Sequence, residues 1–492
     1  MNATDLWTPG RTLHALAAQE PNAAAVYLLH QDGRVSTYTR RELDRQSSRL
    51  AHALAARGVC QHQRIAIHLH NSFEHVLVTL AAYKLGACPT PVSARLPKVE
   101  RDALLGLVDA AAIFSDDADL DAIRTADLHD LAAWPDTLPP DRISQPAKAI
   151  ASGGSTGKPK LIVSPGAFAF PWQGHPLAAV LDFRPGDLVF SPGPLFHNQA
   201  FFFSQIALFQ GAAIALNERF NAEQALTFIE RHQPTVLNMV PTMMQRMLRT
   251  EGLAQRDLSS IRKLWHLAAP CPDWAKLGWI DRIGADRVWE LWAATEITGL
   301  TTISGTDWLS HRGSVGTGFM TDIKILDPDG RERAIGEVGE VFSRFGDGAA
   351  QYAYVGAPPL AEHGDGYRSV GDLGHVDDHG YLYLADRRTD LIISGGSNVY
   401  PAEVEAVISA HPLVRDVAVV GLPDDDLGRR VHAVVETRDP SLTAEQLRTR
   451  CAESLVKYKV PRSFEFVEAL PRNEAGKIRR SALMPRTEST TP

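Results

Sequence analysis

A ten-residue stretch in the first third of the chain, ASGGSTGKPK over residues 151–160, could do phosphate chemistry. Its glycines let the backbone approach a ligand closely, and its exposed N–H groups and hydroxyls can wrap phosphate oxygens. A Walker A loop is ruled out, because three residues instead of four separate Gly153 from Gly157 and because Pro159 stands where a magnesium-binding Ser or Thr is required. Two alternatives remain, a phosphate-binding loop of another kind and a polar surface turn.

The segments before this loop alternate between helical and extended periodicity. Residues 40–58 place leucines at near-helical spacing and end at Gly58, residues 63–70 alternate apolar side chains as a strand does, and residues 73–87 return to helical spacing. The alternation continues to about residue 300, which predicts an α/β domain built of layers.

Beyond about residue 313 the pattern changes to short strands. Residues 323–332 and 374–386 are alternating runs joined by Asp-Gly and His-Gly turns, which indicates hairpins. Pro401 then opens a predicted helix, and residues 414–436 follow as strand, acidic loop and strand. The stretch from about residue 390 has the size of a compact second domain, so we predict domains over 1–386 and 387–492 with a short junction.

The composition limits the class of protein. A chain of 492 residues exceeds one ordinary core, and its net charge of -8, with no run of basic residues, argues against a nucleic-acid-binding surface. We expect no signal peptide and no membrane-spanning segment. The four cysteines are scattered, which predicts neither a disulfide framework nor a zinc site. We therefore expect a cytoplasmic monomer or homodimer that binds neither nucleic acid nor membrane.

Four further boxes follow the glycine-rich loop in a fixed order. They are AATE (293–296), GDLG (371–374), DRRTDLIISGGSNVYPAEVE (386–405) and PRNEAGKIRR (471–480). Together with the loop, they resemble the phosphate-binding, Tyr-Gly-x-Thr-Glu, Gly-Asp, hinge and catalytic-lysine boxes of the acyl-adenylate-forming superfamily. The resemblance implies an α/β fold: a large N-terminal domain of layered α/β sheets with a small β-barrel-like part, then a small mobile α+β C-terminal domain.

The resemblance also implies a two-step reaction. A carboxylate attacks the α-phosphorus of ATP, pyrophosphate leaves, and the resulting acyl-AMP is a mixed anhydride that a second nucleophile can open. Because the acid and ATP are both anionic, the site must supply positive charge and fixed hydrogen-bond donors. The implied cofactors are ATP, Mg²⁺ and CoA.

The catalytic roles that the resemblance implies fall on residues of the matching boxes. Lys477 would bridge the incoming carboxylate and the α-phosphate, as suits a compact ammonium. Glu296 would hold Mg²⁺, because this hard cation prefers carboxylate oxygen, and Thr295 would bond the α-phosphate. Asp372 would accept the ribose hydroxyls, and Arg387 would contact ribose and phosphate. Each residue alone would be interpreted as a solvated surface group.

The remaining nucleotide and cofactor contacts that the resemblance implies lie in the same boxes. They are Ser152, Gly153, Gly154, Ser155, Thr156, Gly157, Lys158, Lys160, Ala269, Trp292, Ala293, Gly395 and Gly396. Two positions depart from the family pattern. Trp292-Ala293 replaces a tyrosine and a glycine at the adenine site, and Thr389 replaces the Asp or Lys of the hinge. An indole still offers a stacking face, whereas the Ala293 methyl group adds bulk near the ligand.

The acyl pocket admits two interpretations. Residues 194–203 match the place where family members carry a histidine beside the acyl site, so His197 is either a gate for the carboxylate or a structural core histidine. The aromatic residues around it, with residues 265–271, either line an apolar pocket or belong to the core; they are Phe196, Phe201, Phe202 and Phe203.

The acyl acceptor is predicted to be CoA. Residues 394–405 and 458–467 most closely resemble boxes of medium-chain, aryl and bile-acid-type CoA ligases, in which the loop around Gly395 and Gly396 lets pantetheine reach the acyl-AMP. The predicted function is ligation of an aromatic, medium-chain or polycyclic acid to CoA. One alternative is a stand-alone amide synthetase that passes the acyl group to a free amine. Another is a non-catalytic nucleotide-binding protein, which would be expected to lack Lys477 or Glu296.

Overall fold

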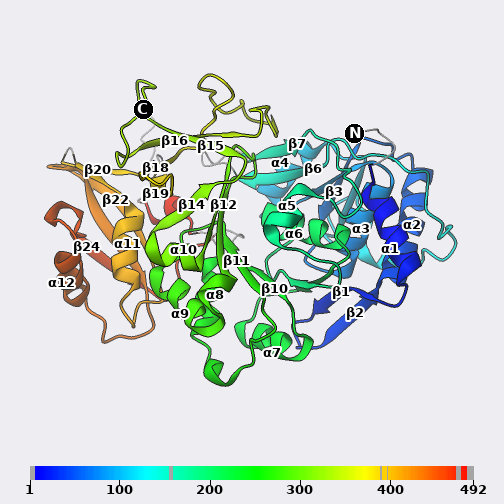
Figure 1. The fold of residues 1–492 in the computed structure, drawn as a ribbon, viewed down its shortest axis with the longest axis horizontal. Helices are drawn as coiled ribbons and strands as arrows, with labels where there is room; N and C mark the ends of the chain where they lie inside the picture. Colours follow the sequence, from blue (N-terminus) through cyan, green and yellow to red (C-terminus); the bar gives the residue numbers. More distant parts are fainter. Residues whose placement is uncertain (1–5, 154–158, 388–389, 396, 473–477, 485–492) are drawn as a thin grey trace.

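The structure, a computed structural model, describes residues 6–153, 159–387, 390–395, 397–472 and 478–484. A large part carries most of the helices and strands, and a smaller C-terminal part lies at one end of the molecule (Figure 1, left). Within these ranges, no helix combines the length and the apolar character that crossing a membrane requires.

A 13-stranded sheet forms the centre of the large part. In one half of this sheet, all neighbouring strands are parallel except the edge strand, which is antiparallel to its neighbour. The alternation of helices and strands predicts this parallel arrangement. From that edge inward the strands are β2 (Val35–Thr39), β1 (Ala24–Leu29), β9 (Ala213–Asn217), β8 (Leu188–Phe190), β10 (Val236–Met239), β11 (Lys263–Leu267) and β12 (Val288–Ala293). The helices between them in sequence are α5 (Pro176–Leu181), α6 (Asn198–Phe209), α7 (Ala222–His232), α8 (Pro241–Leu248) and α9 (Asp273–Ile283).

The other half of this sheet is antiparallel. From β12 outward its strands are β13 (Leu300–Ser304), β14 (Ser314–Gly318), β19 (Leu382–Arg387), β18 (Asp372–Val376), β16 (Gly339–Phe345) and β15 (Thr321–Leu326), with α10 (Gly305–Ser310) after β13. The hairpin predicted over residues 374–386 is the pair β18–β19. Because β15 also contacts β14, this end of the sheet curls toward itself, as the barrel-like part implies.

A smaller parallel sheet carries the first predicted strand. It consists of β4 (Cys88–Pro91), β3 (Arg64–His68) and β5 (Ala112–Ser115), and the helices of this region are α1 (Pro9–Gln19), α2 (Arg40–Ala56), α3 (Phe73–Lys84) and α4 (Lys98–Val108). The helices predicted over residues 40–58 and 73–87 are α2 and α3. A capping box starts α2, because Thr39 Oγ1 accepts from the Glu42 N–H at 3.2 Å while Glu42 Oε2 accepts from the Thr39 N–H at 2.7 Å.

The glycine-rich loop lies in a third sheet. Strands β6 (Lys148–Gly153) and β7 (Pro159–Ser164) form an antiparallel hairpin around it, and β17 (Ala353–Val355) pairs with the other side of β7. The sheet therefore joins a segment from the first third of the chain to one nearly 200 residues later.

The C-terminal part contains the predicted helix and strand pair. Its elements are β20 (Ile392–Ser394), β21 (Ser397–Val399), α11 (Pro401–Ser409), β22 (Asp416–Asp424), β23 (Gly428–Glu436), α12 (Ala444–Ser454) and β24 (Ser463–Val467). Pro401 occupies the first turn of α11, as expected. The α/β class, with a large N-terminal part and a small α+β C-terminal part, is confirmed.

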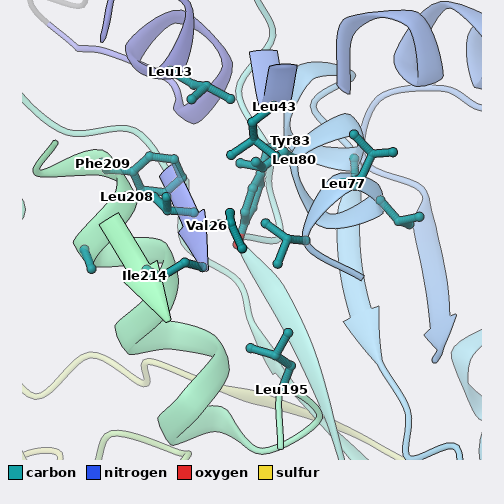
Figure 2. Packing of buried hydrophobic residues seen from close by; sticks show 14 of the residues in the cluster. Leu13, Val26, Leu43, Leu77, Leu80, Tyr83, Leu195, Leu208, Phe209 and Ile214 are labelled. Carbon is teal, nitrogen blue, oxygen red and sulfur yellow. The ribbon is translucent and has the colours of Figure 1, made fainter. Parts of the chain in front are cut away.

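The N-terminal helices pack on the central sheet through an apolar core. Figure 2 shows Leu13, Leu80 and Tyr83 from these helices near Val26 and Ile214 of the sheet. A charged pair is buried beside this core. Lys84 Nζ lies 2.7 Å from Asp44 Oδ1 and 2.7 Å from Ser48 Oγ, and burial lowers the pKa of Lys84 to about 8.

Replacing Asp44 by Asn should destabilise the protein strongly. The change leaves the Lys84 ammonium buried without a counter-charge, which typically lowers the free energy of unfolding by about 3–5 kcal/mol. A lower midpoint in urea unfolding would measure this loss. The double variant Asp44→Asn/Lys84→Met should recover part of it, because no unpaired charge remains; a double variant as unstable as the single one would contradict this account.

Candidate active site

The hairpin β6–β7 places the ends of the glycine-rich loop. Gly153 and Pro159 pair across the hairpin, and Lys160 pairs with Ser152. Predicted contacts Gly154, Ser155, Thr156, Gly157 and Lys158 lie outside the described residues. For Ser152 and Gly153, the structure places the backbone at the end of β6.

Lys160 meets Glu296 and a tyrosine at the base of the loop. Lys160 Nζ lies 3.5 Å from Glu296 Oε1 and 3.8 Å from the centre of the Tyr354 ring. The Tyr354 hydroxyl donates to the same Oε1 at 2.5 Å. Burial and this hydrogen bond to a carboxylate raise the pKa of Tyr354 well above its usual value, so the hydroxyl stays a donor. Glu296 is itself buried, with 8% exposure.

Tyr354 was missed by the sequence analysis. It lies on β17, opposite Ile162 of β7, and thus on the same sheet as Lys160. The alternating run YAYV over residues 352–355 indicates a strand, but 58 residues separate Tyr354 from Glu296, and nothing in that spacing predicts their contact.

Two neighbouring strands end at the same edge of the central sheet and carry predicted contacts. Strands β11 and β12 are parallel, with Leu267 opposite Leu291. Ala269 follows the first, while Trp292 and Ala293 end the second. Ligands of open α/β sheets bind beyond the carboxyl ends of such strands.

Backbone strain is present at this edge. Ala268 has a φ of 74° and Ile297, the residue after Glu296, has a φ of 51°. A side chain with a Cβ rarely adopts this left-handed region, least of all a β-branched one. Strained residues cluster where a loop must fit a ligand or a catalytic group.

Trp292 and Asp372 are brought together across the sheet. The Trp292 indole Nε1–H donates to Asp372 Oδ2 at 3.0 Å, and Asp372 is 7% exposed. Arg387 lies opposite Asp372 in the register of β18 and β19. The two positions predicted for adenine and ribose are therefore adjacent, with the predicted arginine on the neighbouring strand. Ala293 is exposed and Thr295 is partly exposed beside them.

His197 lies at the start of α6, where it is the N-cap residue. Its ring centre lies 4.3 Å from that of Phe196, and both residues are partly exposed. Phe201 and Phe203 are buried, at 0% and 6% exposure, so these two aromatic residues belong to the core, whereas Phe196 and Phe202 face less buried surroundings.

The C-terminal boxes lie in two places. Gly395 occupies the turn between β20 and β21, has a φ of 56°, and donates its N–H to Leu427 O at 2.9 Å. Gly396, Thr389 and Lys477 lie outside the described residues. Arg479, two residues after Lys477, reaches Glu100 Oε1 of α4 at 3.4 Å, and α4 packs against β7. The chain next to Lys477 thus approaches the loop hairpin.

This arrangement is suited to a ligand with both a nucleoside and anionic oxygens. A carboxylate, an ammonium and a hydroxyl meet at the base of a glycine-rich loop, and an indole paired with a carboxylate lies at the nearby sheet edge. The first group offers electrostatic contacts for phosphates and a cation, and the second offers a flat face and acceptors for hydroxyls.

Comparison with known proteins agrees with this geometry. Residues 13–352 match the family described as AMP-binding enzyme, and residues 403–477 match the AMP-binding enzyme C-terminal domain. The long-chain-fatty-acid–CoA ligase FadD13 of Mycobacterium tuberculosis is 30% identical over 92% of this chain and 93% of its own.

Solved structures agree as well. The o-succinylbenzoate CoA synthetase of Bacillus subtilis with its acyl-adenylate intermediate has a TM-score of 0.82 and 28% identity, covering 97% of this chain and 98% of its own. The same synthetase with ATP and magnesium has a TM-score of 0.81 and 29% identity, covering 96% and 98%.

The chain therefore belongs to the AMP-binding enzyme family. The resemblance drawn from the five boxes is confirmed, and so is the prediction of an AMP-forming ligase that uses ATP, Mg²⁺ and CoA, at the level of the family.

Replacing Ala268 by Gly should stabilise the fold. A left-handed conformation costs an L-residue about 1–2 kcal/mol, whereas the added freedom of glycine in the unfolded chain costs about 0.4–1 kcal/mol, so a gain of about 1 kcal/mol remains. The matched control is Ala269→Gly, which has no such strain to relieve and should destabilise by about 0.4–1 kcal/mol. Thermal unfolding compares them; shifts of the same sign would refute the assignment of strain to Ala268.

Proposed function

We propose that this enzyme activates a carboxylic acid with ATP, forms an acyl-AMP with release of pyrophosphate, and transfers the acyl group to the thiol of CoA. The observation that carries the proposal is the meeting of Glu296, Lys160 and Tyr354 at the base of the glycine-rich loop. An acid and ATP repel each other, and such preorganised charges and donors are what lowers the barrier to their reaction.

The Glu296 side chain fits a magnesium ion. Among the described residues, both of its polar contacts reach Oε1, so Oε2 can take a cation. A carboxylate that binds alongside substrate phosphates is a common arrangement for Mg²⁺. When bound there, the ion would neutralise phosphate charge. We propose that Thr295 donates to the α-phosphate, that Lys160 contacts phosphate oxygens, and that Tyr354 fixes the orientation of Glu296.

The nucleoside end of ATP would lie over the sheet edge. We propose that Trp292 stacks on adenine, with Ala293 and Ala269 beside it, and that Asp372 accepts the ribose hydroxyls while Arg387 contacts ribose and phosphate. The hydrogen bond between Trp292 and Asp372 supports this assignment, because it holds the stacking face and the ribose acceptor next to each other.

The C-terminal part would complete the site. We propose domains over residues 1–386 and 387–492, with Lys477 bridging the acid and the α-phosphate in the first step and Gly395 and Gly396 admitting pantetheine in the second. The contact of Arg479 with Glu100 supports the first role, because it brings the segment after Lys477 next to α4 and the loop hairpin. His197, beside Phe196, would lie next to the acyl group.

CoA is favoured over an amine as acceptor. The relatives compared above are named as CoA ligases or synthetases, although they differ in their acids, a long-chain fatty acid and o-succinylbenzoate. A direct test is incubation with ATP, an acid and either CoA or an amine, because thioester and amide are distinct products. An amide without thioester would establish the stand-alone amide synthetase instead.

Replacing Tyr354 by Phe should weaken magnesium use. The change removes the donor that orients Glu296, and losing such a partner of a metal ligand typically costs about 10- to 100-fold in metal affinity. The Mg²⁺ concentration giving half-maximal pyrophosphate release should rise accordingly.

Tyr352→Phe is the matched control for this prediction. The Tyr352 hydroxyl accepts from the Leu360 N–H at 2.7 Å, whereas the hydroxyl that hydrogen-bonds Glu296 is that of Tyr354, so the Mg²⁺ dependence of this variant should stay near that of the parent protein. Equal shifts in both variants would remove the special role of Tyr354.

Replacing Lys477 by Ala should separate the two half-reactions. Losing one preorganised donor costs about 2.7–4 kcal/mol, so acid-dependent pyrophosphate exchange should fall roughly 100- to 1,000-fold. Thioester formation from supplied acyl-AMP and CoA should be spared. Equal loss of both steps would argue that Lys477 supports the fold or both reactions, and would contradict the assigned role.

A further inference from the structure

Among the residues that the structure describes, three lysines are buried, and two of them have a carboxylate partner. Lys84 pairs with Asp44, and Lys276 pairs with Glu290. Lys148, the first residue of β6, is 2% exposed, yet no carboxylate lies within ion-pair distance of it in the described part of the chain. A buried ammonium without a counter-ion is costly, so this exception needs an explanation.

The surroundings of Lys148 are aromatic and neutral. Its Nζ donates to Asn198 Oδ1 in a short contact and lies 4.3 Å from the centre of the Phe202 ring. Both partners belong to α6, and both are partly exposed, so the ammonium lies one side chain below an accessible region. Asn198 is also the first residue of α6, whose positive dipole end adds to the local demand for an anion.

Lys148 shares a face with the proposed phosphate site. In the register of β6 and β7, Lys148 is opposite Ser164 and Ser152 is opposite Lys160. Because side chains alternate along a strand, Lys148 and Lys160 lie on the same face of the hairpin, four residue steps or about 13 Å apart.

The positions between these two lysines on the hairpin are apolar. Ile150 and Ile162 pair with each other there, and both are buried. The opposite face of the hairpin packs into an apolar cluster through Ala149, Leu161 and Val163. Both faces are thus buried, but only the face with Ile150 and Ile162 has a cation at each end of its apolar stretch.

We propose that Lys148 determines acid specificity: it binds a second carboxylate at the far end of the acid, so that the preferred substrate is a dicarboxylic acid with an apolar middle. The inference rests on the proposed function and names the substrate class of that site. The reacting carboxylate would lie near Glu296 and Lys160, and the second carboxylate would supply the counter-ion that the described residues do not provide. The side-chain amide of Asn198 would share this anion.

The test compares dicarboxylic acids with monocarboxylic acids of the same chain length. The ratio of kcat/KM between the two members of a pair, measured by pyrophosphate release, should exceed one for the parent enzyme. In Lys148→Met it should fall about 10- to 150-fold, as for the loss of a hydrogen bond to a charged group. A ratio near one in the parent enzyme, or an unchanged ratio in the variant, would overturn the proposal.

Asn198→Asp provides an independent test. It gives Lys148 an internal carboxylate, as Asp44 does for Lys84, so the thermal midpoint should rise while the preference for dicarboxylic acids is lost. A lower midpoint together with a retained preference would refute the inference. Lys84→Met is the matched control, because it removes a buried lysine elsewhere and should lower stability without changing the ratio.

The pH dependence gives a further readout. Burial lowers the pKa of Lys148 to about 7, and the titratable neighbours are His175 and Cys88, whose pKa values burial shifts to about 4 and about 12. Neither changes charge near neutrality, so the preference should be largest below pH 7 and decline above it as the lysine loses its proton.

Failure of this proposal can be told apart from failure of the proposed function. If only the present proposal fails, the enzyme still forms AMP from some acid; if the proposed function fails, it forms AMP from no acid.

Discussion

The candidate site depends on keeping Lys160 and Glu296 close without letting them neutralise each other. Their 3.5 Å separation is long for an ion pair, and the Tyr354 hydroxyl holds the shared oxygen at 2.5 Å. In a shorter ion pair, each charge would be neutralised by the other. At a larger separation, the two charges would no longer act on the same ligand. Because the three residues lie on β7, on β17 and after β12, this spacing is set by how the small antiparallel sheet meets the end of the central sheet.

The distribution of buried charge follows from the same constraint. Away from the site, the two buried lysines of the described chain have partners within the fold, Asp44 for Lys84 and Glu290 for Lys276. Along the face of the loop hairpin, positive charge is in excess among the described residues, because Lys160 lies 3.5 Å from Glu296 and no described carboxylate pairs with Lys148. An uncompensated charge is destabilising in a buried place, which agrees with the proposed binding of a substrate anion along this face.

The sequence predicted the elements and many of the site residues, but not which of these residues contact one another. Helical and extended periodicity placed α2, β3 and α3, and the turn residues indicated the hairpin β18–β19, because these signals are local. The boxes predicted Glu296 and Asp372 as site residues. The structure places Glu296 next to Lys160 and Asp372 next to Trp292. Tyr354 and Lys148 were missed, because a contact between strands distant in sequence and the absence of a counter-ion are properties of packing.

The contacts inside the C-terminal part are stronger than those that it makes with the large part. This difference favours movement of the C-terminal part as one unit. Inside this part, Arg480 reaches Glu405 at 2.5 Å and Asp390 at 3.8 Å, which ties the lysine box to α11 and to the strand after the junction. Across to the large part, Arg479 and Glu100 are both about half exposed, and exposed pairs of this kind are worth at most about 1 kcal/mol. Arg249 adds two hydrogen bonds to the backbone oxygens of Val414 and Arg415. The internal contacts are therefore the firmer ones, so a rotation between half-reactions would break the Arg479 and Arg249 contacts while Arg480 keeps its ion pair with Glu405 of α11.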